Sequence, residues 1–193
     1  MLLSIIVPTY NESKNILPFV KAITSTIKSK DYEIIFVDDD SADKTYKIVN
    51  DISYKFNMVR CIRRIGRRGL SSAVIEGCLS SSSTLLLVMD ADLQHDEKKI
   101  PEMISLMKKE KLDLVVGSRF LYNTKTTGLS KSRNYLSNLA NFLAIKVSGV
   151  NLSDPMSGFF IIRRSSFETV VLNLSGLGFK ILLDIFSASR KPL

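Results

Sequence analysis

Several features that would narrow the function are scarce in this sequence of 193 residues. It has no tryptophan, one histidine and two cysteines. Cys61 and Cys78 are too few for a disulfide framework and lack the Cys-x-x-Cys spacing, which indicates a reducing compartment. No apolar run approaches the roughly 20 residues that span a bilayer, and the N-terminus has neither a basic leader nor a small-residue cleavage site. We therefore expect any membrane contact to be peripheral.

Basic residues outnumber acidic ones and give a formal net charge of +8. Five arginines fall between positions 60 and 68. Composition alone does not choose among a nucleotide, a nucleic acid and an acidic membrane surface as the anionic partner. The arginine run fits either a solvated basic face or a patch that faces phosphate or membrane.

The hydrophobic pattern predicts a single α/β domain, because short apolar runs alternate with segments of helical spacing. Strands are predicted at residues 3–7, 33–37, 59–63, 84–89, 112–116 and 159–162. Apolar residues at steps of three and four predict helices within residues 16–27, 46–52, 100–107 and 136–147. The last of these follows a basic loop at 122–133, and its apolar stripe is read as core packing or as lipid contact. This alternation of strands and helices favours a mainly parallel central sheet flanked by helices.

The most informative stretch is an apolar run, Leu85 to Met89, that ends in Asp90-Ala91-Asp92. A strand covered on both faces shows such a run, and functional groups of parallel sheets lie just past its carboxyl end. If the chain stays extended, Asp90 and Asp92 point to the same side. Two carboxylates there can hold Mg²⁺ or Mn²⁺ together with phosphate oxygens, although an isolated Asp-x-Asp also occurs as a helix cap or a solvated turn.

Polar groups follow three of the predicted strands and should converge at one edge of the sheet. The first strand leads into Pro8 to Glu12, the second into Asp38 to Asp40, and the fourth into Asp90 to Asp92. Asp39 is placed to contact a ribose or a base. The sequence has no Gly-x-Gly-x-x-Gly after the first strand and no Walker loop, so a metal at Asp92 and basic side chains would have to neutralise a diphosphate.

An ordered set of motifs resembles family 2 glycosyltransferases, most closely the branch of dolichyl-phosphate mannosyltransferases and other polyprenyl-phosphate glycosyltransferases. The motifs are Pro8-Thr9-Tyr10-Asn11-Glu12, Val37-Asp38-Asp39, Arg64 to Leu70, Asp90-Ala91-Asp92-Leu93-Gln94-His95, Gly117-Ser118-Arg119, Asp154 to Phe159 and Gly178-Phe179-Lys180. They cover nearly the whole chain in the family's order. The resemblance implies a GT-A type nucleotide-sugar-binding fold in one domain over residues 1–193.

The resemblance also assigns roles to individual residues. It implies that nucleotide and sugar are bound by Pro8, Tyr10, Glu12, Val37, Asp39, Asp90, Ala91 and Lys180. Asp92 and Gln94 would ligate Mg²⁺ or Mn²⁺. Asp92 and Arg119 would be the catalytic residues, with Arg119 and Lys180 meeting phosphates of the donor or the acceptor.

The implied reaction is an inverting transfer of mannose from GDP-mannose to dolichyl or polyprenyl phosphate. A phosphate monoester has a second pKa of about 6, so its oxygen is largely anionic at neutral pH and needs no strong base. The single histidine, His95, is accordingly read as a local orienting residue. The implied location is peripheral, on the cytoplasmic face of a membrane, with no nucleic acid as partner.

Relatives in this family continue past the position of Leu193 with another strand and a basic loop. We therefore expect either a chain truncated at its C-terminal end, or a neighbouring chain or membrane-anchoring subunit that supplies the missing cations. Three alternatives stay open: UDP-glucose or another nucleotide sugar as donor, a non-catalytic scaffold that binds nucleotide or membrane, and a receiver-like switch with Asp38 to Asp40 as its acidic pocket. The last lacks an acidic pair after the first strand.

Overall fold

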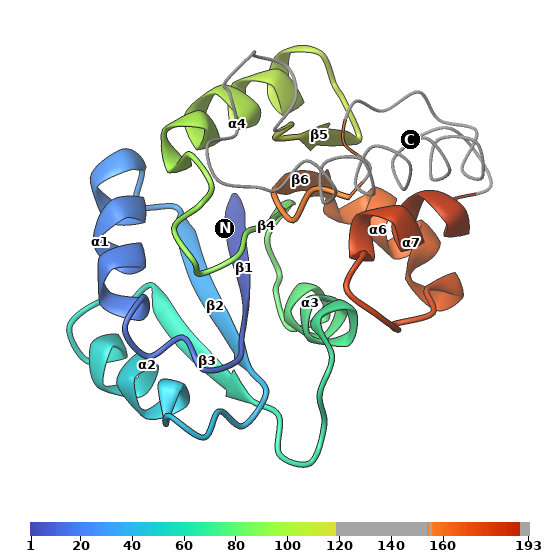
Figure 1. Ribbon diagram of the computed structural model, residues 1–193. Helices are drawn as coiled ribbons and strands as arrows, with labels where there is room; N and C mark the ends of the chain where they lie inside the picture. The colour runs from blue at the N-terminus through green and yellow to red at the C-terminus, as the bar shows by residue number, and fades with distance from the viewer. Residues whose placement is uncertain (119–153, 155, 190–193) are drawn as a thin grey trace, which may run out of the picture.

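A six-stranded sheet forms the centre of the computed structural model, which describes residues 1–118, 154 and 156–189 (Figure 1). The strand order is β3-β2-β1-β4-β6-β5. The strands are β1 (Leu3–Thr9), β2 (Tyr32–Asp38), β3 (Val59–Arg63), β4 (Leu85–Val88), β5 (Leu114–Val116) and β6 (Phe160–Arg163). The helices are α1 (Ile16–Thr26), α2 (Thr45–Ser53), α3 (Leu70–Leu79), η1 (Glu97–Lys99), α4 (Ile100–Lys109), α6 (Arg164–Val170), η2 (Val171–Asn173) and α7 (Ile181–Ala188).

The sheet is mainly parallel, as the sequence predicts. Strands β3, β2, β1 and β4 run in one direction, whereas β6 pairs antiparallel with both β4 and β5. The predicted α/β class, with helices on both faces of the sheet, is therefore confirmed (Figure 1). The antiparallel direction of β6 is not visible in its own sequence, because direction depends on the connection that precedes a strand.

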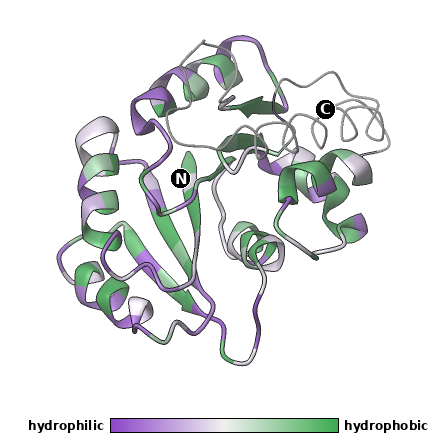
Figure 2. Cartoon of the chain, viewed as in Figure 1, coloured by the Kyte–Doolittle hydropathy of each residue, from purple (hydrophilic) through white to green (hydrophobic). Residues whose placement is uncertain are grey.

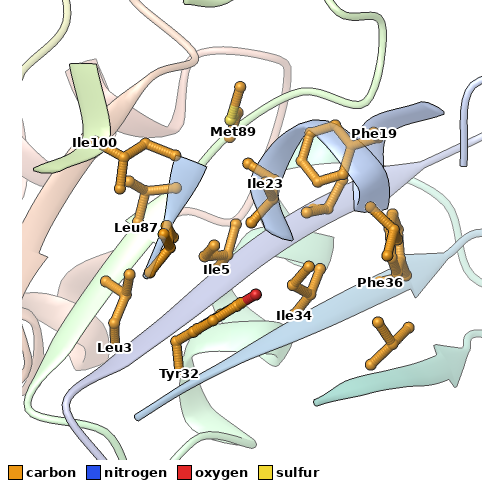
Figure 3. Packing of buried hydrophobic residues seen from close by; sticks show 14 of the residues in the cluster. Leu3, Ile5, Phe19, Ile23, Tyr32, Ile34, Phe36, Leu87, Met89 and Ile100 are labelled. Carbon is orange, nitrogen blue, oxygen red and sulfur yellow. The ribbon is translucent and has the colours of Figure 1, made fainter. Parts of the chain in front are cut away.

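Side chains of the central strands alternate between two hydrophobic clusters. In β2, Ile34 and Phe36 belong to the cluster that also contains residues of α1, α2 and α4, whereas Ile35 and Val37 belong to the cluster that contains residues of α3, α6 and α7. Figure 3 shows the first cluster, in which the rings of Phe19 and Phe36 meet edge to face at 5.8 Å. Burial on both faces explains why the strands appear as continuous apolar runs (Figure 2).

Helix α3 is absent from the sequence-based prediction, and its composition shows why. Its buried face consists largely of small residues, so it carries no clear stripe of large apolar side chains: Ser71, Ala73, Val74, Gly77 and Cys78. Small residues let the helix approach the sheet closely. The predicted loop at 122–133 and the apolar stripe at 136–147 lie outside the described residues.

Within the described ranges, the helices are too short or too polar to cross a bilayer.

Replacing Gly77 with alanine tests the close contact between α3 and the sheet. A Cβ atom there would lie 2.4 Å from Cγ2 of Ile6 and 2.9 Å from Cγ2 of Val37. We expect overpacking to outweigh the gain in helix propensity and to lower the free energy of unfolding by about 1–2 kcal/mol in urea denaturation. Asn50→Ala at an exposed position of α2 is the control. A Gly77→Ala variant as stable as the wild type would contradict this packing.

The two cysteines are free thiols, and burial raises the pKa of each to about 12. The charge of Asp38 adds to the effect at Cys61. Since the thiolate is the reactive form, both should react with a maleimide at pH 8 far more slowly in the native protein than in guanidinium. Mass spectrometry at timed intervals measures this. Rapid native labelling of Cys78 would show that α3 detaches from the sheet.

Candidate functional site

A cavity of about 570 Å³ opens at the carboxyl ends of β1, β2 and β4. It is lined by Pro8, Thr9, Tyr10, Glu12, Asp39, Arg68, Gly69, Leu70, Ala73, Asp90, Ala91, Asp92 and Phe179. The three strand ends thus meet at one place, which confirms the convergence expected from the sequence. A second cavity of about 290 Å³ shares Leu70, Asp90, Asp92 and Phe179 with the first and adds Gln94, His95 and the segment 156–158.

Hydrogen bonds fix the loop after β1 to the loop after β2. The backbone NH of Asn11 donates to Ser41 Oγ at 2.9 Å, and that of Glu12 donates to Thr45 Oγ1 at 3.0 Å. Asp43 accepts from the NH of Ser13 at 3.0 Å. Burial opposes ionisation of Asp43, but hydrogen bonds from Thr45 and Ser13 prevail and lower its pKa. Tyr10 and Glu12 therefore belong to a loop anchored beside Asp39.

The consecutive aspartates after β2 have three different environments. Asp38 is fully buried and accepts hydrogen bonds from Thr9 and from Ser41. Asp40 pairs with Arg63, whose Nε donates to it at 2.6 Å. Only Asp39 lines the cavity. A cluster of three carboxylates, as the receiver-like alternative requires, is therefore not formed.

Asp39 is held by the backbone of α3 and by a buried arginine. Its Oδ2 accepts from the NH of Gly69 at 2.7 Å, and its Oδ1 lies 3.0 Å from Nη1 of Arg64. Arg64 is 2% exposed and also lies 3.4 Å from Glu76. The contact with Arg64 is an ion pair without hydrogen-bond geometry, so within the described structure Oδ1 has no hydrogen-bond donor. Asp39 thus lines the cavity as a carboxylate whose Oδ1 is buried against Arg64.

Asp90 is oriented by residues from two other segments. Strand β4 ends at Val88, and Ala91 and Asp92 lie in a turn, so the chain is not extended there as the sequence suggested. His95 Nε2 lies 3.3 Å from Asp90 Oδ2, and the His95 ring stacks on Phe159 with centroids 5.2 Å apart. A Cβ at Gly158 would lie 2.5 Å from the same carboxylate oxygen. The turn nevertheless leaves both aspartates at both cavities.

Asp92 and Gln94 offer oxygen ligands suited to a hard cation. Asp92 is exposed, accepts from the NH of Gln94 at 3.0 Å and has no cationic partner in residues 1–118, 154 and 156–189. The same ranges contain no group of three or more His, Cys, Asp or Glu side chains arranged around a metal. The carboxylates of Asp90 and Asp92 and the amide oxygen of Gln94 fit Mg²⁺ or Mn²⁺ if a substrate and water supply the remaining ligands, which is usual for these ions.

Two predicted site residues within the described ranges, Val37 and Lys180, are not in the cavity walls. Val37 is fully buried and packs against α3, because its side chain points to the opposite face of the sheet from Phe36. The side chain of Val37 therefore supports the sheet, and the expected contact of this residue with the base stays a prediction. Lys180 is exposed at the start of α7 and lines neither cavity, and its expected contact with phosphate stays a prediction. Arg119 lies outside the described residues.

Other cavity residues were not predicted. Phe179 lines both cavities although its side chain is 82% exposed. Phe179 belongs to the motif Gly178-Phe179-Lys180, in which only the lysine carries a charge that indicates a phosphate contact. Arg68 lines the first cavity, and its only signal was membership of the arginine run.

Comparison of the sequence with protein families and with proteins of known function identifies its relatives. Residues 4–171 match the family described as Glycosyl transferase family 2. The chain is 39% identical over 187 residues to a dolichol-phosphate mannosyltransferase of Pyrococcus furiosus, covering 96% of this chain and 52% of the relative. A protein of the same name from Saccharomyces cerevisiae is 33% identical over 197 residues, covering 98% and 71%. The chain spans about half the length of the Pyrococcus relative.

Solved structures with low sequence identity share the fold. A glucosyl-3-phosphoglycerate synthase of Mycobacterium tuberculosis, in complex with Mn²⁺, UDP-glucose and phosphoglyceric acid, has a TM-score of 0.72 at 16% identity, over 95% of this chain and 63% of that one. A mannosyltransferase of Pyrobaculum calidifontis, in complex with GDP-Man and Mn²⁺, has a TM-score of 0.61 at 19% identity, over 86% and 45%. These similarities confirm the predicted GT-A type fold.

Removal of Arg64 tests the buried pair behind Asp39. Arg64→Ala leaves the buried Asp39 without its cation, and we expect the free energy of unfolding to fall by about 3 kcal/mol in urea denaturation. Arg67→Ala is the matched control, because Arg67 pairs with the same Glu76 at 2.9 Å but is exposed. Its effect should be about 0–1 kcal/mol. Equal effects of the two substitutions would show that burial of the pair has no energetic weight.

Proposed function

Because the chain belongs to glycosyl transferase family 2, we propose that it transfers mannose from GDP-mannose to dolichyl or another polyprenyl phosphate, with inversion at the sugar. One observation carries this proposal. One cavity is lined by Tyr10, Asp39 and Asp90-Ala91-Asp92, which follow three different strands and belong to three of the motifs that resemble this family. Relatives named dolichol-phosphate mannosyltransferase at 33–39% identity favour this lipid acceptor and mannose over other choices.

The nucleoside half of the donor fits the side of the cavity formed by β1 and β2. Pro8, Tyr10 and Glu12 come from the anchored loop after β1, and the carboxylate of Asp39 lines the cavity beside them. A ribose hydroxyl or a base NH can donate to a carboxylate oxygen.

The diphosphate fits the side formed by β4. Asp92 and Gln94, with Asp90 and the backbone of Ala91 beside them, would hold Mg²⁺ or Mn²⁺. When bound, the cation supplies positive charge that stabilises the departing nucleoside diphosphate. His95 orients Asp90, with which its Nε2 is in contact, and its ring packs on Phe159.

The acceptor needs little activation. A lipid phosphate is largely dianionic at neutral pH, so its oxygen can attack the sugar without a general base. Attack on the face opposite the leaving group accounts for inversion. Arg119 is proposed as the cation that meets the phosphates, and Lys180 would join it only after a movement of its side chain into the cavity.

A lipid acceptor implies action at a membrane surface, and we propose peripheral association with its cytoplasmic face. A membrane-anchoring subunit or a further segment of the protein would then complete the site. No nucleic acid is expected as a partner, because the relatives are named for transfer of mannose to dolichol phosphate.

Isothermal titration with GDP-mannose tests the donor site. We expect binding in Mn²⁺ that weakens about tenfold or more in Asp92→Asn, a loss of about 1.4 kcal/mol or more, because one anionic ligand becomes neutral. Asp51→Asn on the exposed side of α2 is the control and should bind like the wild type. If Asp92→Asn binds as well as the wild type, the metal site is wrong.

The same titration with UDP-glucose decides the donor, since UDP-glucose is the sugar nucleotide in the Mycobacterium structure. Transfer of radiolabelled mannose to dolichyl phosphate then separates an enzyme from a nucleotide-binding scaffold. Donor binding without transfer, in the presence of detergent and Mn²⁺, would favour the scaffold.

A further inference from the structure

Four of the five arginines between residues 60 and 68 are neutralised by carboxylates of the same chain. The pairs are Arg60 with Glu33 at 2.8 Å, Arg63 with Asp40 at 2.6 Å, Arg64 with Asp39 at 3.0 Å and Arg67 with Glu76 at 2.9 Å. The basic run is therefore mostly an internal electrostatic network. It is neither a uniform solvated face nor a continuous patch for phosphate or membrane.

Arg68 is the exception. No carboxylate pairs with it in the part of the chain that the structure describes, and its guanidinium carbon lies 4.8 Å from the centroid of the Tyr10 ring. Both residues line the larger cavity. The cation–π contact holds the guanidinium of Arg68 at the cavity wall. No carboxylate of the described residues binds its N–H groups there.

The strand order places Arg68 at the end of the cavity remote from the metal ligands. Arg68 lies between β3 and α3, next to Gly69, whose NH binds Asp39. Asp39 follows β2, whereas Asp92 follows β4, and β1 separates these strands. Two strand spacings amount to about 10 Å. A nucleotide with its diphosphate at Asp92 therefore directs its base toward Tyr10 and Arg68.

We propose that Arg68 contacts the edge of the donor's base and selects guanine over uracil, an inference that rests on the function proposed above. A guanidinium presents two parallel N–H donors, which match the adjacent O6 and N7 acceptors of guanine. Uracil has no such neighbouring pair, because an N–H donor separates its two carbonyl groups. Arg68 thus gives this site a preference that Tyr10, Glu12 and Asp39 do not supply by residue type alone.

Nucleotide titrations with the 193-residue chain in Mn²⁺ test the proposal. The ligands are GDP, UDP and 7-deaza-GDP, which lacks the N7 acceptor. Arg68→Lys keeps the charge but loses the fork, so we expect the ratio of GDP to UDP affinity to fall about tenfold, the factor that corresponds to about 1.4 kcal/mol. Arg63→Lys is the matched control, because Arg63 also stacks on a tyrosine, Tyr46 at 3.9 Å, but lines neither cavity.

The wild type should bind 7-deaza-GDP more weakly than GDP, and Arg68→Ala should bind the two equally. Equal affinities in the wild type would overturn the proposal without any variant, which also decides the case if Arg68→Ala fails to fold by circular dichroism. If Arg68→Ala weakens GDP and UDP equally, Arg68 acts on phosphate and the proposal is wrong. Absence of any nucleotide binding by the wild type would instead refute the proposed function itself, and this inference with it.

Discussion

The parallel pairing of β2, β1 and β4 is the constraint on which the site depends. Parallel neighbours must end at the same edge of the sheet, so the loops that follow them are brought together although their residues are 30 to 80 positions apart in the sequence. The core fixes this arrangement, because each of these strands is buried on both faces and cannot shift its register without exposing apolar side chains. Precision at the cavity is then a matter of local hydrogen bonds, such as those from Asn11 and Glu12 to the loop after β2.

Sequence patterns predicted the elements whose buried positions hold large apolar residues. The strands were recognisable because large apolar residues fill both of their faces, and β3 was predicted with its observed bounds. Helix α3 was missed because its contact with the sheet needs small residues, with Gly77 directly against Ile6, and small residues form no hydrophobic stripe. The direction of β6 depends on the preceding connection, which local sequence does not encode.

The site was predictable in its location more than in its detail. Polar residues after apolar runs placed Asp39, Asp90 and Asp92 at one edge, and the structure gathers them at one cavity. The side chain of Val37 lies on the face of the sheet that packs against α3, which a motif does not reveal because it names neighbours without distinguishing the two faces of a strand. The arginines show that net charge, too, does not reveal which side chains are free to bind a ligand. A net charge of +8 suggests a broad anionic partner, yet pairing within the chain leaves one guanidinium of the run at the cavity.

Asp39 shows how structural and ligand-binding roles combine in one side chain. Its burial would raise the free energy of the native state without compensation, and Arg64 with the NH of Gly69 supplies that compensation. A lysine could not replace Arg64, because the guanidinium also donates to the carbonyl of Gly69 and the hydroxyl of Ser72. Both oxygens of Asp39 thus have partners within the chain, Oδ2 in the NH of Gly69 and Oδ1 in the charge of Arg64. The fold therefore holds a charged carboxylate rigidly at the cavity, so a ligand that donates to Asp39 does not bear the cost of ordering that side chain.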